Sequence, residues 1–543
     1  MRTADRTSMV AILAIAGMAT AFPASAQDLP DHFRSRLDPE RERTDPAAPE
    51  TASLPTGTTQ LNASIPTGLQ ISTVNFRGVP VPAKVARAAE PYIGRPLTSD
   101  NLQTLVDALS DAYRETDVAL FTLVVPEQDF EGGNVDLLAA EGYVEQVKIA
   151  GDLTKSEQAL VASHAARLTK IRPASRAVYE RNLLLLDDVP GLTVSESLAQ
   201  GSERGGVKLR LDAEQKRTDF SVGYDSRTTR LIDQGQVSGE AAGYGLLRAG
   251  DQTRLNLAAS TDFEDFRYAS LQHSTPLGTF GTRASVGAAE LQSFAEDSGL
   301  EGRASLYSLG LSHPFVRSSQ QNLRASLVAD VLNSNNAAFG SLLSTERTRA
   351  LRGRLAYDWT RGDTVAAASV QVSQGFDVLE ARISQPVGEL EFLTADANIK
   401  LAQRFADQYY LRLNLTGQWS DDPLPANERF SVGGPNYGRA FENGVINADT
   451  GAAALVEAAY RPLKTGKFAD SEVYAFADYA TVGFVGRDLP ERQLGSAGAG
   501  IRAAYSDFGE LGLEAAKPYE TPSPDDADDW QFNISWRITF DPR

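Results

Sequence analysis

The chain has no cysteine, only four histidines, and no long apolar run after its first 26 residues. Without cysteine it can form neither a disulfide framework nor a cysteine-ligated metal site. A membrane-spanning helix needs about 20 apolar residues, so a helical membrane protein is excluded, whereas strands that cross a membrane are not. The 52 Lys and Arg residues against 71 Asp and Glu residues give a net charge of -19, which argues against nucleic acid as a partner.

Catalytic signatures are missing as well. None of the histidines (His32, His164, His273 and His313) has metal-ligand spacing to another. The sequence contains no P-loop, G-x-S-x-G motif or dinucleotide-binding fingerprint. It therefore predicts no enzyme, no metal and no cofactor. Glycoside hydrolysis by a pair of carboxylates stays an open alternative, because the chain has many acids and no motif selects two of them.

The first 26 residues predict an export signal. Arg2 and Arg6 precede the apolar stretch Met9–Phe22, and Ala24-Ser-Ala26 offers a small-x-small cleavage site. This stretch is too short for a membrane anchor. We therefore expect the mature chain to begin at Gln27, in the periplasm of a bacterium or beyond it.

Residues 27–66 predict a short helix followed by a linker. The segment Asp28–Arg43 is dense in charge and places Phe33 and Leu37 four residues apart, on one side of a helix. Residues 45–67 carry four prolines among Ala, Thr and Ser, which is typical of an extended linker.

Two similar modules are predicted next, over 67–143 and 144–215. Val74-Asn-Phe-Arg-Gly78 resembles Val147-Lys-Ile-Ala-Gly151, and each segment opens a unit with the order strand, helix, helix, strand, strand. A single α+β domain is the alternative. Apolar spacing predicts helices over 100–113, 154–168 and 174–187, and later strands over 119–125, 135–144, 192–195 and 207–211.

From residue 216 to 543 the chain changes to alternating segments of about ten residues. In the last one, Phe532, Ile534 and Trp536 alternate with polar Asn533 and Ser535. Periodicity alone fits a soluble sandwich, with the apolar face in its core, or a membrane barrel, with that face towards lipid. The export signal, the aromatic last strand and the lack of intervening helices favour the barrel.

Turn signals allow the strands to be counted. About seven short turns, with one longer connection at 421–450, predict eight hairpins and about sixteen strands. Roughly 20 residues per strand and connection give the same even number. The turns are expected at 249–251, 276–281, around Pro314, and at 361–363, 406–407, 462–466 and 507–509.

The order of these parts resembles the haemolysin/haemagglutinin secretion-activation family of two-partner-secretion transporters, in the POTRA-barrel superfamily. The likeness is carried by Gly94–Leu102, Ser274–Gly278, Ser312–Arg317 and, most specifically, Glu428–Phe441. The last segment is similar to the family's sixth loop, which folds back into the barrel. Gly438-Arg-Ala-Phe441 stands where Val-Arg-Gly-Tyr or Val-Arg-Gly-Phe is usual.

The resemblance implies a fold and a set of loop-anchoring residues. The fold is a transmembrane β-barrel in the outer membrane, preceded by two periplasmic α+β POTRA domains and an N-terminal plug helix over 28–43. Without the resemblance, that segment would be a leader with no such role. Gly433, Gly434, Arg439 and Phe441 would anchor the loop, and Phe476-Ala-Asp478 matches the Phe-x-Asp pattern of the facing strand.

We therefore expect a lumenal ion pair between Arg439 and Asp478, because a guanidinium inside a barrel needs a carboxylate to offset its desolvation. The alternative places Arg439 in a solvated outer loop.

The resemblance also implies a function. The first POTRA module would capture an unfolded exoprotein by edge pairing, near a groove with Leu102, Leu105, Leu109, Tyr113 and Phe121. The barrel would carry this client, such as a haemolysin or an adhesin, to the cell surface, with or without activating it. Other expected partners are outer-membrane lipid and, during biogenesis, barrel-assembly machinery and periplasmic chaperones. The alternatives are an assembly factor for outer-membrane proteins and, less favoured, a passive porin.

Overall fold

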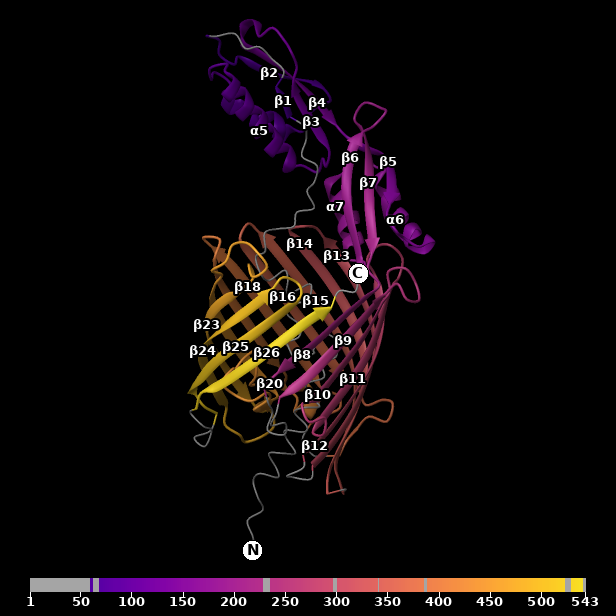
Figure 1. Ribbon diagram of the computed structural model, residues 1–543, viewed down its shortest axis with the longest axis vertical. Coiled ribbons are helices and arrows are strands. Elements are labelled where there is room, and N and C mark those ends of the chain that lie inside the picture. Colours follow the sequence, from indigo (N-terminus) through magenta and orange to yellow (C-terminus); the bar gives the residue numbers. More distant parts are fainter. Residues whose placement is uncertain are drawn as a thin grey trace. The chain divides into compact units, whose positions relative to one another are not determined.

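The structure is a computed structural model that describes residues 59–61, 68–227, 235–295, 300–339, 341–384, 388–522 and 529–540. The predicted export signal, the helix over 28–43 and most of the linker lie outside these residues. The chain divides into two compact units, one with the two N-terminal modules and one with the barrel (Figure 1). None of the helices in the described part of the chain has the length and apolarity needed to cross a membrane.

The first module is a four-stranded sheet in the order β1-β3-β4-β2, with its helices packed on it. The Thr98 side chain caps the main helix by accepting a hydrogen bond from the N–H of Asn101. Thr59–Leu61 of the predicted linker forms a strand, parallel to β3, because extended chain can pair with a free sheet edge. The elements are β1 (Thr59–Leu61), β2 (Thr73–Gly78), α4 (Ala83–Ala88), η1 (Glu90–Tyr92), α5 (Ser99–Arg114), β3 (Phe121–Val125), η2 (Glu131–Gly133) and β4 (Asn134–Glu141).

The second module is a three-stranded sheet in the order β5-β7-β6, covered by two helices. Thr154 and Glu157 form a capping box at the start of its first helix. The repeated motif ends in glycine for the same reason in both modules. Gly78 and Gly151 have φ of 106° and 117°, and a neighbouring carbonyl lies where a Cβ would be. The elements are β5 (Tyr143–Ala150), α6 (Lys155–Leu168), α7 (Arg176–Asp187), β6 (Leu192–Gln200) and β7 (Gly206–Gln215).

The two sheets have separate apolar cores, which favours two modules over a single α+β domain. The predicted strand over 135–144 is wrong in one respect. It ends at Glu141, and Tyr143 starts the next sheet. Gly142 lies between them, with its N–H donated to the carbonyl of Leu120, so the chain passes from one sheet to the other at this residue.

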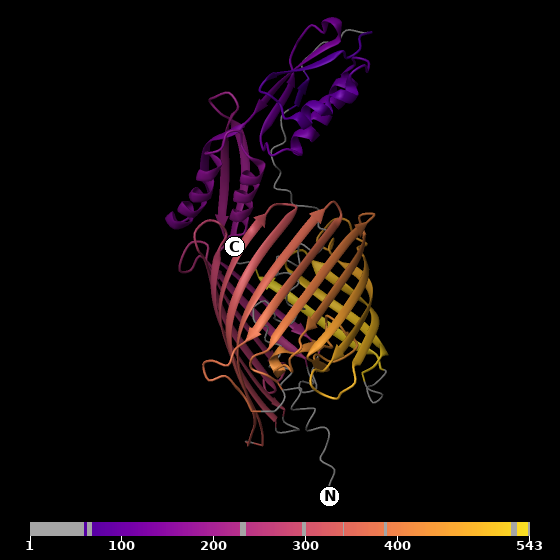
Figure 2. The ribbon, with the colours of Figure 1, turned by 180° about the vertical axis from the view of Figure 1, so that it is seen from behind.

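The second unit is a closed antiparallel barrel of sixteen main strands, as predicted; the far wall is seen in Figure 2. A two-residue strand, β17, joins it from a loop. The strands are β8 (Thr218–Asp225), β9 (Gln236–Tyr244), β10 (Gln252–Ser260), β11 (Phe266–Pro276), β12 (Arg283–Ala295), β13 (Leu300–Arg317), β14 (Gln321–Ala338), β15 (Ser341–Arg361), β16 (Thr364–Gly375), β17 (Arg382–Ile383), β18 (Leu393–Phe405), β19 (Tyr409–Trp419), β22 (Thr450–Tyr460), β23 (Glu472–Gly483), β24 (Arg492–Tyr505), β25 (Gly509–Glu520) and β26 (Gln531–Phe540).

The barrel is apolar outside and polar inside. β26 closes it by pairing with β8, from Ser535 opposite Asp225 to Phe540 opposite Phe220. On β26, the Phe532 side chain is 72% exposed on the outer face, whereas its polar neighbour Asn533 is buried inside. Burial also alternates along β23, where Val473 and Tyr479 face outwards, but its inner face mixes the acids Glu472 and Asp478 with apolar side chains such as Phe476. A soluble sandwich would bury its apolar face, so the structure decides for a membrane barrel.

Six of the seven predicted short turns lie between strands as expected. The turn expected around Pro314 is misplaced. Pro314 lies within β13, and the chain turns at residues 318–320. Ser312 is the last residue of β13 that pairs with β12, so proline enters the strand where a missing N–H can be tolerated.

Candidate functional site in the barrel lumen

The long connection between β19 and β22 folds into a small hairpin. β20 (Phe430–Val432) pairs with β21 (Ile446–Ala448), and residues 433–445 form the tip between them. Gly433 and Gly434 have φ of 104° and 100°, and the carbonyl of Glu442 and the side chain of Asn443 occupy the places of their missing Cβ atoms. These two glycines therefore allow the tight tip that presents Arg439.

Arg439 is buried at the tip and pairs with two acids of the barrel wall. Its Nη1 lies 3.1 Å from Glu457 on β22 and 3.1 Å from Glu514 on β25. Its Nε donates to the carbonyl of Pro435 at 2.9 Å, and the guanidinium lies over the ring of Phe476, 4.5 Å from the centroid. The solvated-loop alternative is therefore wrong, since the arginine is 6% exposed.

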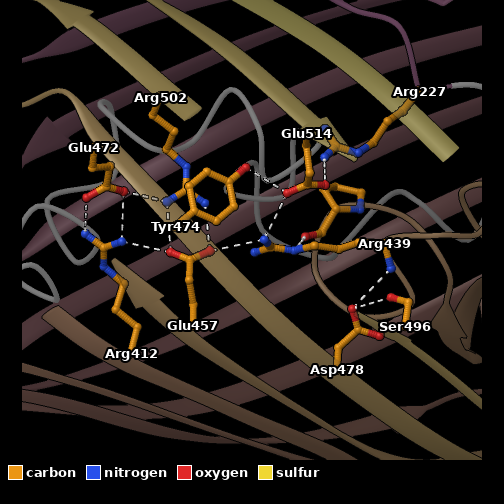
Figure 3. A network of polar contacts seen from close by, with 11 residues as sticks. Arg227, Arg412, Arg439, Glu457, Glu472, Tyr474, Asp478, Ser496, Arg502 and Glu514 are labelled. Atoms are coloured by element: carbon orange, nitrogen blue, oxygen red, sulfur yellow. Dashed lines mark hydrogen bonds and ion pairs between the residues drawn. The ribbon is translucent and has the colours of Figure 1, made fainter. Parts of the chain in front are cut away.

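Asp478 meets the loop in a different way from the predicted ion pair. Its carboxylate accepts the main-chain N–H groups of Gly438, at 2.7 Å, and Arg439, at 3.3 Å, and the hydroxyl of Ser496 at 2.6 Å. The guanidinium of Arg439 contacts Glu457 and Glu514 instead (Figure 3). The two residues do meet, but the expected side-chain pair is wrong, because Asp478 holds the backbone of the turn while the longer side chain continues past it.

The remaining residues of the predicted loop motif pack around these contacts. Phe441 and Tyr437 are half-buried and touch the apolar clusters that line β22, β23 and β24. Phe476 belongs to the same cluster and supplies the ring beneath Arg439. The predicted residues Gly433, Gly434, Arg439, Phe441, Phe476 and Asp478 thus come together at one place in the lumen.

A second layer of charges continues the site along the wall. Glu457 also accepts two hydrogen bonds from Arg502, both at 2.8 Å, and one from Arg412 at 2.8 Å. Arg412 and Arg502 both reach on to Glu472. The network joins five arginines to six carboxylates: Arg227, Arg412, Arg439, Arg461 and Arg502, and Asp225, Glu457, Asp470, Glu472, Asp478 and Glu514.

This arrangement fixes the position of the loop tip in the lumen. Charges that are buried together are tolerated when each has a partner of opposite sign, and removal of one partner is costly. Tyr474 donates to Glu514 at 2.8 Å, so the second wall acid is held from the side as well. In the described residues, no three His, Asp or Glu side chains are grouped as a metal ion would require.

The sequence did not indicate Glu457 and Glu514 as partners of the arginine. A signal was present for Glu457, which is the only acid of β22, at a position that alternation directs inwards; Glu514 shares its strand and its parity with Glu510 and is not distinguished in this way. That signal does not say which lumenal acid the loop tip reaches, because the answer depends on how the closed sheet places β22 and β25 around the loop.

The predicted client-binding residues are in the core of the first module. Leu102, Leu105, Leu109 and Tyr113 of α5 have no exposed surface, and Phe121 of β3 is 5% exposed. Tyr113 and Phe121 stack on each other, with ring centroids 4.6 Å apart. The apolar face of the helix packs on its own sheet, so these side chains do not line a groove open to a client.

Comparison with known proteins decides the family. Residues 205–503 match the family described as haemolysin secretion/activation protein ShlB/FhaC/HecB, and residues 69–142 match the ShlB-type POTRA domain. The chain belongs to the haemolysin secretion/activation family. As a member with a closed outer-membrane barrel and POTRA modules, it is a two-partner-secretion transporter.

Individual relatives are distant but cover most of the chain. The heme/hemopexin transporter protein HuxB of Haemophilus influenzae is 22% identical over 513 residues, which are 87% of this chain and 87% of that protein. The structure of CdiB from Escherichia coli covers 99% of this chain and 100% of its own, with a TM-score of 0.67 and 18% identity. BamA from Haemophilus ducreyi, lacking POTRA domains 1–3, has a TM-score of 0.54 and 13% identity over 86% of this chain and 99% of its own. These two structures share the fold.

Proposed function

We propose that this transporter moves one large, unfolded exoprotein from the periplasm to the cell surface, and that the loop hairpin closes the path at rest. The observation that carries the proposal is the tip of the hairpin, which lies inside the barrel and is held there by buried ion pairs to β22 and β25. Ion pairs can be broken and remade without covalent chemistry, so such a closure is reversible.

The lumen suits an extended polypeptide more than a specific small solute. Its wall presents polar and charged residues from many strands, such as Asn256, Asp330, Asn533 and Arg537. A moving backbone needs hydrogen-bonding groups along its way, because each unsatisfied group in an apolar channel would cost several kcal/mol. Folding of the client outside would then bias its motion outwards without nucleotide hydrolysis.

The client is first held by edge pairing on the first POTRA module. The edge strand on one side of that sheet is β1, a strand of the chain itself that pairs with β3. At the other edge, β2 pairs with β4 and with no other strand in the described residues. We infer that β2 is where an extended client segment adds to the sheet, through main-chain hydrogen bonds that do not require a particular sequence.

Proteomics of a deletion strain tests the proposal. Culture supernatant, cell surface and outer membrane are compared between wild type, deletion and complemented strains. Loss of one or two large exoproteins with an unchanged set of outer-membrane barrels supports a dedicated transporter and identifies its client. A broad loss of outer-membrane barrels would instead show an assembly factor, and a change only in small-solute uptake would show a porin.

A further inference from the structure

The root of the loop hairpin has its own buried ion pair, on a different part of the barrel wall from Arg439. Glu428 ends the short helix η4 (Ala426–Glu428), just before β20. Its two carboxylate oxygens accept from Nη1 and Nη2 of Arg352 on β15, at 2.7 and 2.8 Å. The Nε of Arg352 donates to Asp330 on β14 at 2.8 Å. One wall arginine thus joins the loop to two neighbouring strands.

Neighbouring residues of the root are fixed to the same wall. The side chain of Asn427 donates to the hydroxyl of Thr348 on β15 at 3.0 Å. Leu424 is fully buried, in an apolar cluster with Ala350 and Phe392. Its N–H donates to Asp449, which also accepts from Arg487, so the two ends of the connection are tied together at the root.

The Glu428–Arg352 pair at the root and the ion pairs of the tip lie on separate stretches of the barrel. The strand order places β16, β18 and β19 between β15, which holds the root, and β22, the nearest strand that holds the tip. The two contacts also have opposite polarity. At the root a loop acid meets a wall arginine, and at the tip a loop arginine meets wall acids. The loop therefore spans part of the lumen between two separate anchors.

We propose that Glu428 and Arg352 form a second anchor that positions the loop independently of Arg439, and that both anchors must release for the path to open fully. This inference rests on the proposed function of the loop as a closure. Bidentate geometry and burial make the root pair specific: reversal of either charge alone places like charges in contact and leaves a buried group without its partner. Because Asp330 also contacts Arg352, the reversals are made in an Asp330→Asn background, in which reversal of both residues restores attraction between them without placing the new glutamate against a second acid.

The test is a charge-reversal cycle on the purified full-length protein in planar lipid bilayers, without any client. We expect Glu428→Arg and Arg352→Glu each to raise the open probability of the channel at least tenfold, and the double variant to return it most of the way to wild type. A matched control is Arg404→Glu. Arg404 pairs with Asp363 at a short turn and has no contact with the loop in the described residues.

A second readout follows the hairpin itself. Because the chain has no cysteine, Val432→Cys introduces a single thiol, on β20 at a site that is 1% exposed. Labelling of this thiol by a water-soluble maleimide should be faster in each single reversal and slow again in the double variant.

Folding is checked by the shift in gel mobility that folded barrels show on heating. If a single reversal does not fold, Glu428→Gln, which keeps the shape and loses the charge, takes its place and is expected to raise open probability several-fold.

The second anchor is overturned if the folded single variants have the open probability and the labelling rate of wild type. It is also overturned if the open probability of the double variant is no closer to wild type than that of the single variants. Neither result depends on secretion. The proposed function fails separately, if the deletion strain loses no exoprotein.

Discussion

Removal of the Arg439 side chain should shift the loop away from its resting position. Arg439→Ala deletes both ion pairs, to Glu457 and to Glu514, together with the contact to the ring of Phe476. Loss of one member of a buried ion pair costs about 3–5 kcal/mol. Since about 1.4 kcal/mol is a factor of ten, the ratio of closed to open loop should fall roughly 100-fold to 4000-fold.

The upper part of this range would require the wall acids to be left without a partner of opposite charge. Glu457 keeps Arg412 and Arg502 as partners, and Glu514 keeps Arg227, so neither acid is left alone when Arg439 is removed. The main-chain N–H groups of residues 438 and 439 also keep their acceptor in Asp478. We therefore expect the measured shift to lie near the lower end of the range, at about 100-fold.

Single-channel recording of the purified protein measures the shift as open probability. Arg439→Lys is the matched control, because it keeps the charge but loses the planar donor set, and it should give a smaller increase than the alanine variant. If Arg439→Ala folds and its open probability equals that of wild type, the buried pairs do not hold the loop and the reasoning is refuted.

Further predictions concern the wall, the membrane face and the POTRA modules. Asp478→Asn should raise the open probability less than Arg439→Ala does, because an amide oxygen still accepts one N–H. The expected cost to the closed loop is about 1–3 kcal/mol, and bilayer recording measures the open probability. Val370→Arg, on the outer face of β16, should lower barrel stability in lipid vesicles by about 2–4 kcal/mol in urea unfolding, whereas Gln371→Arg, facing the lumen, should not. Leu105→Ala should destabilise the first module by about 2–5 kcal/mol, seen as faster hydrogen exchange in α5, because it removes core volume. Burial lowers the pKa of His164 to about 4, with the positive charge of Arg167 adding to the effect, so the folded second module disfavours the protonated form. Its contribution to stability is present above the ordinary histidine pKa near 6.5 and is lost as the pH falls from there towards 4; hydrogen exchange in α6 should quicken over this range, and His164→Phe should remove that dependence.

The fold was predictable because its signals are local. Alternation along β26 defines a polar and an apolar face with no knowledge of the partner strands, and the spacing of Leu102, Leu105 and Leu109 predicts α5. The break at Gly142 was missed, because apolar residues continue on both sides of it and only the two separate sheets show that the strand ends there.

The site was predictable only as far as the resemblance reached. Arg439 and Asp478 were expected to be close, and they are. Their bonding could not be derived, because whether a long side chain turns to one acid or passes on to another depends on the three-dimensional position of β22, β23 and β25. The core positions of Tyr113 and Phe121 show the opposite error, in which an apolar face that packs internally was interpreted as a binding groove.

Reconstituted transport is the measurement that tests the central claim most directly. The purified transporter is placed in lipid vesicles with the unfolded client identified from the deletion strain, and protease accessibility shows on which side of the membrane the client lies. We expect the client to cross the membrane without nucleotide, more slowly when the loop is locked to the wall by an engineered disulfide. A client that stays on its original side, or that inserts into the membrane as a barrel, would contradict the account.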